Sequence, residues 1–262
     1  MRDLRITLIQ AEQAWEDLDR NLDAFSRRLD EREAESDLIV LPEMFTTGFT
    51  MNAPELAQEM DGSGVRWLID RSRSCQADIV ASLIIREGNC FYNRLVWTTP
   101  DGQLYSYDKR HLFRMAGEEK VYSPGTRKIT VGLHGWKIRP FICYDLRFPI
   151  WTRSFANEYD VALFIANWPE KRADHWRVLL RARAVENQAF VVGLNRIGED
   201  GTGLAYSGDS MVIDPTGQVL FDAGRNPAVE TVRIRYETLN EYRAAFPAWM
   251  DAEDAPGVKS PP

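Results

Sequence analysis

The sequence predicts an α/β fold in which two central β-sheets are covered on their outer faces by helices. Segments with strand character outnumber segments with helical periodicity along the 262 residues, and several apolar strands are followed directly by a helix. No internal repeat, low-complexity tract or linker-like change of composition divides the chain. We therefore expect one domain over residues 1–250 and a tail over 251–262 that is rich in Asp, Pro and Gly.

The first half of the chain contains five expected strands and two expected helices. Apolar residues at helical spacing between charged residues indicate the helix at 17–34. The apolar run at 37–43 is stopped by Pro42, which is typical of a buried strand that ends at a loop. The turn at 100–102 (PDG) separates two strand-like segments as a hairpin. In chain order we expect strands at 4–10, 37–43, 78–86, 91–98 and 103–108, and helices at 17–34 and 62–76.

The second half begins after a polar loop at 109–126. A helix is expected to start near Phe148-Pro149, because proline is tolerated in the first turn of a helix. A Gly-rich loop at 198–208 leads into a hairpin that turns at 214–217 (DPTG). In chain order we expect strands at 128–132, 136–143, 161–168 and 189–196, and a further helix at 173–187.

The overall charge excludes one class of partner. The chain carries 32 Lys and Arg against 39 Asp and Glu, which gives a formal net charge of -7. A mildly acidic protein has no electrostatic attraction for a polyanion, so we expect no nucleic-acid partner. If the substrate is anionic, its site must carry local Arg or Lys against the global sign.

Cysteine and histidine usage bound the compartment and the cofactors. The three cysteines are an odd number without a CxxC pair, which favours a reducing compartment. The start MRDLRITLIQ lacks the apolar run of a secretory signal, and no stretch approaches the roughly 18 apolar residues that span a bilayer. We expect a cytoplasmic protein without a membrane partner. The three histidines show no ligand spacing, so no metal or other cofactor is expected.

Three residues that follow strand-like runs could carry chemistry. Cys143 precedes an expected helix, whose free N–H groups would lower the pKa of its thiol, but it could equally be a small core residue. Glu43 follows LIVLP, where a carboxylate is placed for acid–base work unless it lies in water. Lys109 follows LYSYD and, beside a reactive thiol, would donate to a developing oxyanion; alone it would be a solvated charge.

Three separated motifs resemble one family. LPEMFTTGF (41–49), YDKRHLF (107–113) and FICYDLRFP (141–149), in this order and spacing, closely resemble the nitrilase-like carbon–nitrogen hydrolases, which carry Glu, Lys and Cys in these contexts. The similarity continues through NW (167–168), RARAVENQ (181–188) and GDSMVIDPTGQVL (208–220). The resemblance implies a four-layer α-β-β-α sandwich and a Cys–Glu–Lys hydrolase that cleaves a small amide without a metal.

The resemblance also implies further site residues. The family uses a second Glu in a loop after the Lys motif, and spacing back from Gly125 favours Glu118 over Glu119. Glu118 would position Lys109, and the backbone N–H of Tyr144 would help to stabilise the oxyanion. His111, two residues after the Lys, is expected to anchor the loop rather than to act as a catalyst.

Within the family, the sequence looks most like the omega-amidase branch, which removes the terminal amide of alpha-ketoglutaramate and alpha-ketosuccinamate. The shared features are CYDLRFP, ANWP, HW before the RARA helix, and NRIG before a Gly-rich loop. Arg147 is the first candidate for binding a substrate carboxylate, although it could instead pair with Asp145. The other candidates for lining the pocket are the segment 45–49, which begins with Phe45, and Arg196. Trp168 is also a candidate, although core packing is the better expectation for a Trp.

Other functions remain open at this point. The rivals within the family are a deaminated-glutathione amidase and an N-carbamoyl amino acid hydrolase. A papain-like hydrolase would need one of the three histidines, and a silent binding protein would not need the Cys, Glu and Lys together. Relatives pair through helices beside the active site, so the resemblance implies a homodimer, with segment 149–158 and the C-terminal tail as interface elements.

Overall fold

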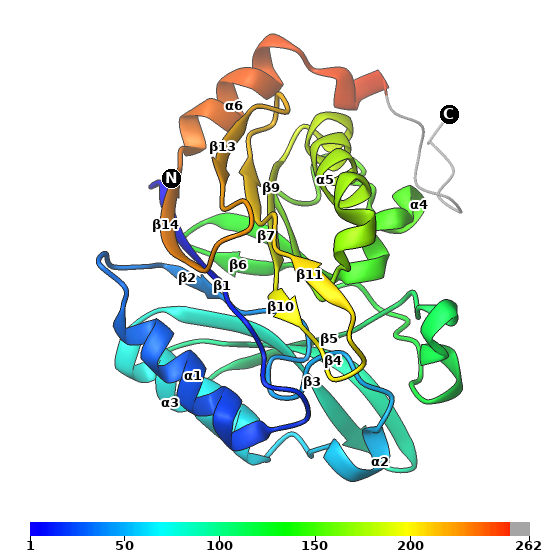
Figure 1. Ribbon diagram of the computed structural model, residues 1–262. Coiled ribbons are helices and arrows are strands. Elements are labelled where there is room, and N and C mark those ends of the chain that lie inside the picture. The colour runs from blue at the N-terminus through cyan, green and yellow to red at the C-terminus, as the bar shows by residue number, and fades with distance from the viewer. Residues whose placement is uncertain (252–262) are drawn as a thin grey trace.

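A computed structural model describes residues 1–251. Two six-stranded sheets form the centre of the molecule and helices lie outside them, which confirms the predicted α-β-β-α sandwich (Figure 1). The first sheet has the order β14 (Ala228–Ile234), β1 (Leu4–Gln10), β2 (Leu38–Val40), β3 (Asp78–Glu87), β4 (Cys90–Thr98) and β5 (Leu104–Asp108). The second has the order β13 (Val219–Asp222), β12 (Met211–Ile213), β9 (Phe190–Asn195), β8 (Val161–Ala166), β7 (Trp136–Ile142) and β6 (Val131–Leu133).

The remaining elements are helices and one small hairpin. The hairpin pairs β10 (Ile197–Glu199) with β11 (Ala205–Ser207). The α-helices are α1 (Leu18–Asp30), α2 (Ala53–Leu56), α3 (Ser63–Cys75), α4 (Pro149–Thr152), α5 (Ala173–Asn187) and α6 (Tyr236–Ala245). Short 3-10 helices are η1 (Arg114–Ala116), η2 (Glu118–Lys120), η3 (Cys143–Arg147), η4 (Glu170–Arg172) and η5 (Ala248–Asp251).

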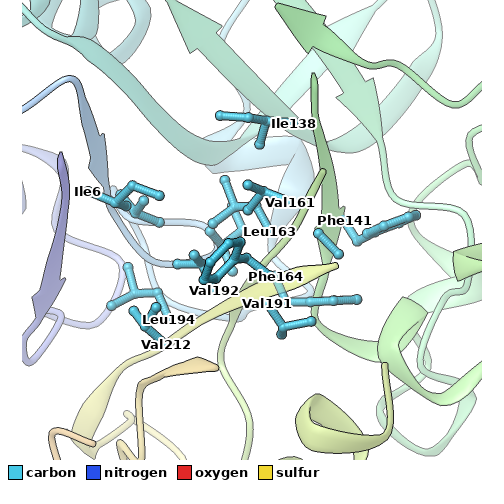
Figure 2. Packing of buried hydrophobic residues seen from close by; sticks show 14 of the residues in the cluster. Ile6, Ile138, Phe141, Val161, Leu163, Phe164, Val191, Val192, Leu194 and Val212 are labelled. Carbon is cyan, nitrogen blue, oxygen red and sulfur yellow. The ribbon is translucent and has the colours of Figure 1, made fainter. Parts of the chain in front are cut away.

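Alternate residues of the first sheet point into two different cores. Leu38 and Val40 of β2 pack between the sheets, whereas Ile39 packs outward against Phe25 of α1. This follows from the two-residue period of a strand, whose successive side chains face opposite sides of the sheet. Figure 2 shows part of the inter-sheet core, with Ile6 of β1 among residues of the second sheet. β2 is therefore buried on both faces, as its continuous apolar run predicted.

Strand direction brings the site together. β1, β2 and β3 are parallel, and β5 runs in the same direction because it is antiparallel to β4, which is antiparallel to β3. In the second sheet, β7, β8 and β9 are parallel. Parallel strands end at the same edge of a sheet, so the loops after β2, β5, β7 and β8 can meet there.

Some expected elements differ from the structure. The helix expected at 17–34 ends at Asp30, and the helix expected from Phe148-Pro149 is the single turn α4, preceded by η3. The β10–β11 hairpin, β14 and α6 were not predicted from the sequence. The hairpin strands have three residues each and lie in a Gly-rich loop, and β14 is a partly exposed edge strand, so these strands carry little apolar periodicity. Residues 252–262 of the expected tail lie outside the described residues.

The close packing of α5 on β9 gives a test of the fold. A Cβ at Gly193 would lie 2.4 Å from Cδ1 of Leu180 and 3.0 Å from Cζ2 of Trp176. We expect Gly193→Ala to lower the free energy of unfolding by about 1–3 kcal/mol through overpacking, as measured by urea denaturation. The control is Gly132→Ala in β6, where no atom lies within 4 Å of the added Cβ, and we expect it to stay within about 0.5 kcal/mol of the wild type. Equal losses in both variants would contradict this packing.

Candidate active site

Glu43, Lys109 and Cys143 converge at the carboxyl ends of strands from both sheets. Glu43 lies three residues after β2, Lys109 directly after β5, and Cys143 directly after β7. Glu118, on η2, completes the cluster, whereas Glu119 lies in the lining of a different hollow. Each of these four side chains is buried, and Glu43 and Glu118 have no exposed surface.

Lys109 is the centre of the charged cluster. Its Nζ donates to Oε1 of Glu43 at 2.9 Å and to Oε1 and Oε2 of Glu118 at 2.9 and 3.0 Å. Burial alone lowers the pKa of a lysine, but the Glu118 and Glu43 carboxylates outweigh it, and the net pKa of Lys109 lies above its ordinary value. Lys109 is therefore a fixed ammonium at neutral pH.

Glu43 is held by donors on both carboxylate oxygens. Its Oε1 accepts from Lys109 and from Nδ2 of Asn93 at 2.7 Å, and its Oε2 accepts from the backbone N–H of Asn167 at 2.7 Å. The Asn167 side chain donates to the Glu43 carbonyl at 2.5 Å. These bonds fix the orientation of the carboxylate.

Cys143 lies at a strained junction between β7 and η3. Its φ of 44° lies in the left-handed region, which costs a non-glycine residue about 1–3 kcal/mol unless the surroundings hold it. Its Sγ lies 3.9 Å from the carbonyl oxygen of Asn167. The expectation of a lowered thiol pKa is wrong: burial first, and then the Glu43 charge, raise the pKa of Cys143 well above its ordinary value, and Lys109 only partly opposes them. The thiol is therefore neutral at rest.

A buried carboxylate ties the Lys109 segment to the Cys143 turn. Asp145 accepts from Oη of Tyr107 at 2.6 Å and from the backbone N–H of His111 at 2.9 Å, and it contacts Nδ1 of His111 at 2.8 Å. Tyr107 and His111 stand two residues on either side of Lys109, and Asp145 stands two residues after Cys143. His111 thus anchors the loop, as its position in the sequence indicated.

Part of the cluster lines a pocket of about 370 Å³. Cys143 and Lys109 both belong to its lining, and so does Tyr144, the second residue of η3, whose backbone N–H has no acceptor within that helix. The other lining residues are Trp15, Phe49, Thr50, Met51, Asn52, Phe113, Ala116, Arg147, Asn167, Trp168, Pro169, Arg172, Asp200, Thr202, Leu204 and Tyr206.

Arg147 lines this pocket rather than pairing with Asp145. Its Cζ lies 4.9 Å from the ring centroid of Trp168, which is also in the lining, and its Nη2 is 2.8 Å from Nδ1 of His175. Asp145 is instead satisfied by the donors on the Lys109 segment. The alternative of an Arg147–Asp145 pair is therefore excluded.

Arg172 provides a second guanidinium in the same lining. It lies in η4, directly after the NW motif, with Cζ 5.1 Å from the ring centroid of Phe113. Burial, followed by the nearby charge of Arg147, lowers the pKa of Arg172. Two like charges face the pocket, so the pocket favours an anion.

Two expected lining residues lie elsewhere. Phe45 is fully buried on the outer side of the first sheet against Phe25 and Trp67, so its assignment to the pocket is corrected. Phe49, from the same motif, takes its place in the lining. Arg196 is also absent from the lining, because its guanidinium is buried and donates to backbone carbonyls of neighbouring loops.

Three residues of the site were not identified from the sequence. Asn93 lies within a strand, where a polar residue predicts exposure rather than a buried contact with two carboxylates. Asn167 was part of a quoted motif, but nothing in that motif assigned it a contact with Glu43. Arg172 is one of many basic residues near a helix start, and only the pocket distinguishes it.

Residues 1–251 contain neither a candidate metal-binding cluster nor a candidate membrane-spanning helix. Within that range, no group of three His, Cys, Asp or Glu side chains could hold a metal ion. None of the helices in the same range has the length and apolar character needed to cross a membrane.

Two known proteins are similar to this chain over most of its length. The chain is 45% identical over 255 residues to the omega-amidase YafV of Escherichia coli K12, covering 97% of this chain and 98% of that protein. It is 36% identical to the 2-oxoglutaramate amidase of Bacillus subtilis 168, covering 85% and 87%.

The solved structures agree with these relatives. XC1258 from Xanthomonas campestris, described as a CN-hydrolase superfamily protein with an arsenic adduct in the active site, matches with a TM-score of 0.95 at 43% identity and covers 97% of this chain and 98% of that one. The model of the carbon-nitrogen hydrolase family matches residues 5–244. The chain therefore belongs to the carbon–nitrogen hydrolase family.

Proposed function

We propose that this enzyme is an omega-amidase, which hydrolyses the terminal amide of alpha-ketoglutaramate or alpha-ketosuccinamate to the dicarboxylate and ammonia. The observation that carries the proposal is that two guanidinium groups, Arg147 and Arg172, line the same pocket as Cys143. A substrate with a carboxylate at one end and an amide at the other matches this arrangement. The names of the relatives from E. coli and B. subtilis support the same activity.

Acylation begins with a neutral thiol. Because the pKa of Cys143 is raised, the thiol needs a base as it attacks, and Glu43 is the carboxylate beside it. The S–H bond breaks as its proton moves to Glu43, and the sulfur forms a bond to the amide carbon. The electron pair of the amide C=O moves to its oxygen.

The oxyanion needs positive charge and donors in fixed positions. Lys109 supplies a permanent ammonium, and the free backbone N–H of Tyr144 supplies a second donor. Loss of one such donor typically raises the barrier by about 3–4 kcal/mol. Glu118 acts through Lys109, because its two oxygens hold the ammonium on the side away from the pocket.

The same carboxylate completes the cycle. Glu43 returns its proton to the nitrogen as the C–N bond breaks, and ammonia leaves with Cys143 held as a thioester. Glu43 then takes a proton from water as the water oxygen attacks the thioester carbon. The C–S bond breaks as the second carboxylate of the product forms, and the Cys143 sulfur takes that proton back from Glu43. No cofactor takes part in these steps.

We also propose a homodimer that forms through α4 and α5. Ile150, Val178 and Val185 are 77%, 65% and 50% exposed on these helices, and exposed apolar residues that gather on one face favour association. Ile150 lies in the segment 149–158 that the resemblance implied. We expect sedimentation equilibrium at micromolar concentration to give twice the chain mass and Val178→Asp to give the monomer. A wild-type monomer under these conditions would contradict the proposal.

A substrate panel tests the proposed activity. We expect kcat/KM for alpha-ketoglutaramate to exceed that for pentanamide, a plain amide of the same chain length, by about 100-fold or more, because charge-assisted hydrogen bonds to the carboxylate are lost in pentanamide. The panel includes alpha-ketosuccinamate and an N-carbamoyl amino acid. If the wild type hydrolyses alpha-ketoglutaramate no faster than it hydrolyses pentanamide or the N-carbamoyl amino acid, the proposal is contradicted.

Variants of the two arginines sharpen the same test. Arg172→Met and Arg147→Met should each lower kcat/KM for alpha-ketoglutaramate by about 10- to 100-fold, mainly through KM, and change pentanamide turnover far less. Arg20→Met is the control, since Arg20 is exposed on α1, away from the proposed interface, and lies outside the pocket lining. An equal loss on both substrates would show that the arginines do not bind the carboxylate.

A further inference from the structure

Asn93 lies in the middle of β4 and contacts all three residues of the charged cluster, Glu43 and Glu118 through its side chain and Lys109 through its backbone. Its side chain is buried, and its Nδ2 donates to Oε1 of Glu43 at 2.7 Å and lies 3.5 Å from Oε1 of Glu118. Its backbone carbonyl accepts from the N–H of Lys109 at 3.0 Å. It does not line the pocket, so it acts on the reaction through these groups rather than on the substrate.

The orientation of the Asn93 amide is determined by Ser82. The backbone N–H of Met44 donates to Oγ of Ser82 at 2.8 Å, which leaves the hydroxyl hydrogen of Ser82 free for Oδ1 of Asn93 at 2.8 Å. The NH₂ group must then face the carboxylates. The reversed amide would place its oxygen against Oε1 of Glu43, where two acceptors would meet without a hydrogen between them.

Asn93 and Lys109 together fill the hydrogen-bonding capacity of Oε1, one of the two carboxylate oxygens of Glu43. A carboxylate oxygen accepts about two hydrogen bonds, and Oε1 already has Lys109 at 2.9 Å and Asn93 at 2.7 Å. Among residues 1–251, Oε2 has one hydrogen-bond donor, the backbone N–H of Asn167 at 2.7 Å. The Sγ of Cys143 lies 3.9 Å from the carbonyl oxygen of the same Asn167 whose N–H donates to Oε2, so Asn167 links the thiol to Oε2 rather than to Oε1.

We propose that Asn93, oriented by Ser82, is a positioning residue that keeps Oε1 of Glu43 occupied and confines the proton transfers of that carboxylate to Oε2. This inference rests on the proposed role of Glu43 as the base. In acylation the S–H bond of Cys143 breaks and an O–H bond forms at Oε2. The same proton moves from Oε2 to the nitrogen as the C–N bond breaks, so no proton is stored on the oxygen that faces away from the substrate.

The pH profile of kcat/KM tests this role, because a merely structural residue would not move it. Profiles are measured with whichever amide the wild type hydrolyses fastest. In Asn93→Ala, the carboxylate loses a donor that favours its charged form, so the acid limb should move to higher pH by about half a unit or more. We expect kcat/KM to fall by about 10- to 100-fold, mainly in kcat.

Two further variants complete the design. Ser82→Ala leaves Asn93 in place but removes the donor that orients its amide, together with the acceptor of the Met44 N–H, so it should move the acid limb in the same direction by a smaller amount. Thr98→Val is the matched control on β4, because the Thr98 hydroxyl is fully buried without a hydrogen-bond partner among the described residues and lies outside the pocket lining. It should leave the profile unchanged.

The outcomes separate this inference from the proposed activity. If folded Asn93→Ala and Ser82→Ala keep the acid limb of the wild type, the inference is overturned even when kcat falls. If Asn93→Ala does not fold by circular dichroism, the limb of Ser82→Ala decides alone. If the omega-amidase proposal fails, the wild type will hydrolyse another amide of the panel at least as fast as alpha-ketoglutaramate. That result does not change the pH at which the acid limb of the profile lies.

Discussion

The buried ammonium of Lys109 between the carboxylates of Glu43 and Glu118 is the interaction on which the site depends. An isolated charge inside a protein is costly, and breaking a buried pair by removing one partner typically costs about 3–5 kcal/mol. Here each charge has its partners within 3.0 Å. The fold meets this constraint because β2 and β5 run in the same direction and deliver Glu43 and Lys109 to one edge of the sheet.

The second sheet adds the thiol of Cys143 to the charged cluster. Cys143 arrives at the same edge from β7, and Asp145 ties the turn that carries it to the residues on either side of Lys109. The Cys143 thiol and the Lys109 ammonium are therefore held in fixed positions relative to each other, although they come from different sheets. The raised pKa of the thiol fits this arrangement, since a neutral thiol beside a fixed carboxylate transfers its proton only when a substrate is attacked.

Much of this could be predicted from the chain, and the misses have physical causes. Glu43, Lys109 and Cys143 each follow a strand-like run, which is a weak signal alone; the resemblance of the three motifs to one family identified them as a set. The direction of the Cys143 pKa shift was wrong, because a helix start can be read from sequence whereas the burial of a thiol near two carboxylates cannot. Phe45 and Phe49 share one motif, and only the turn after β2 decides which of them faces the pocket. Asn93 was missed because its partners, Glu43 and Glu118, lie far from it in the sequence. Arg172 was missed because its proposed partner is the substrate, which the sequence does not contain.

The central claim is that Cys143 becomes acylated by the amide. The most direct measurement is intact mass after rapid acid quench of the reaction with saturating alpha-ketoglutaramate, followed by peptide mapping. We expect a mass increase equal to the acyl group on the peptide that carries Cys143, present in a Cys90→Ala control and absent in Cys143→Ala, which should also lose turnover. The same adduct in Cys143→Ala, or undiminished turnover by that variant, would contradict the claim.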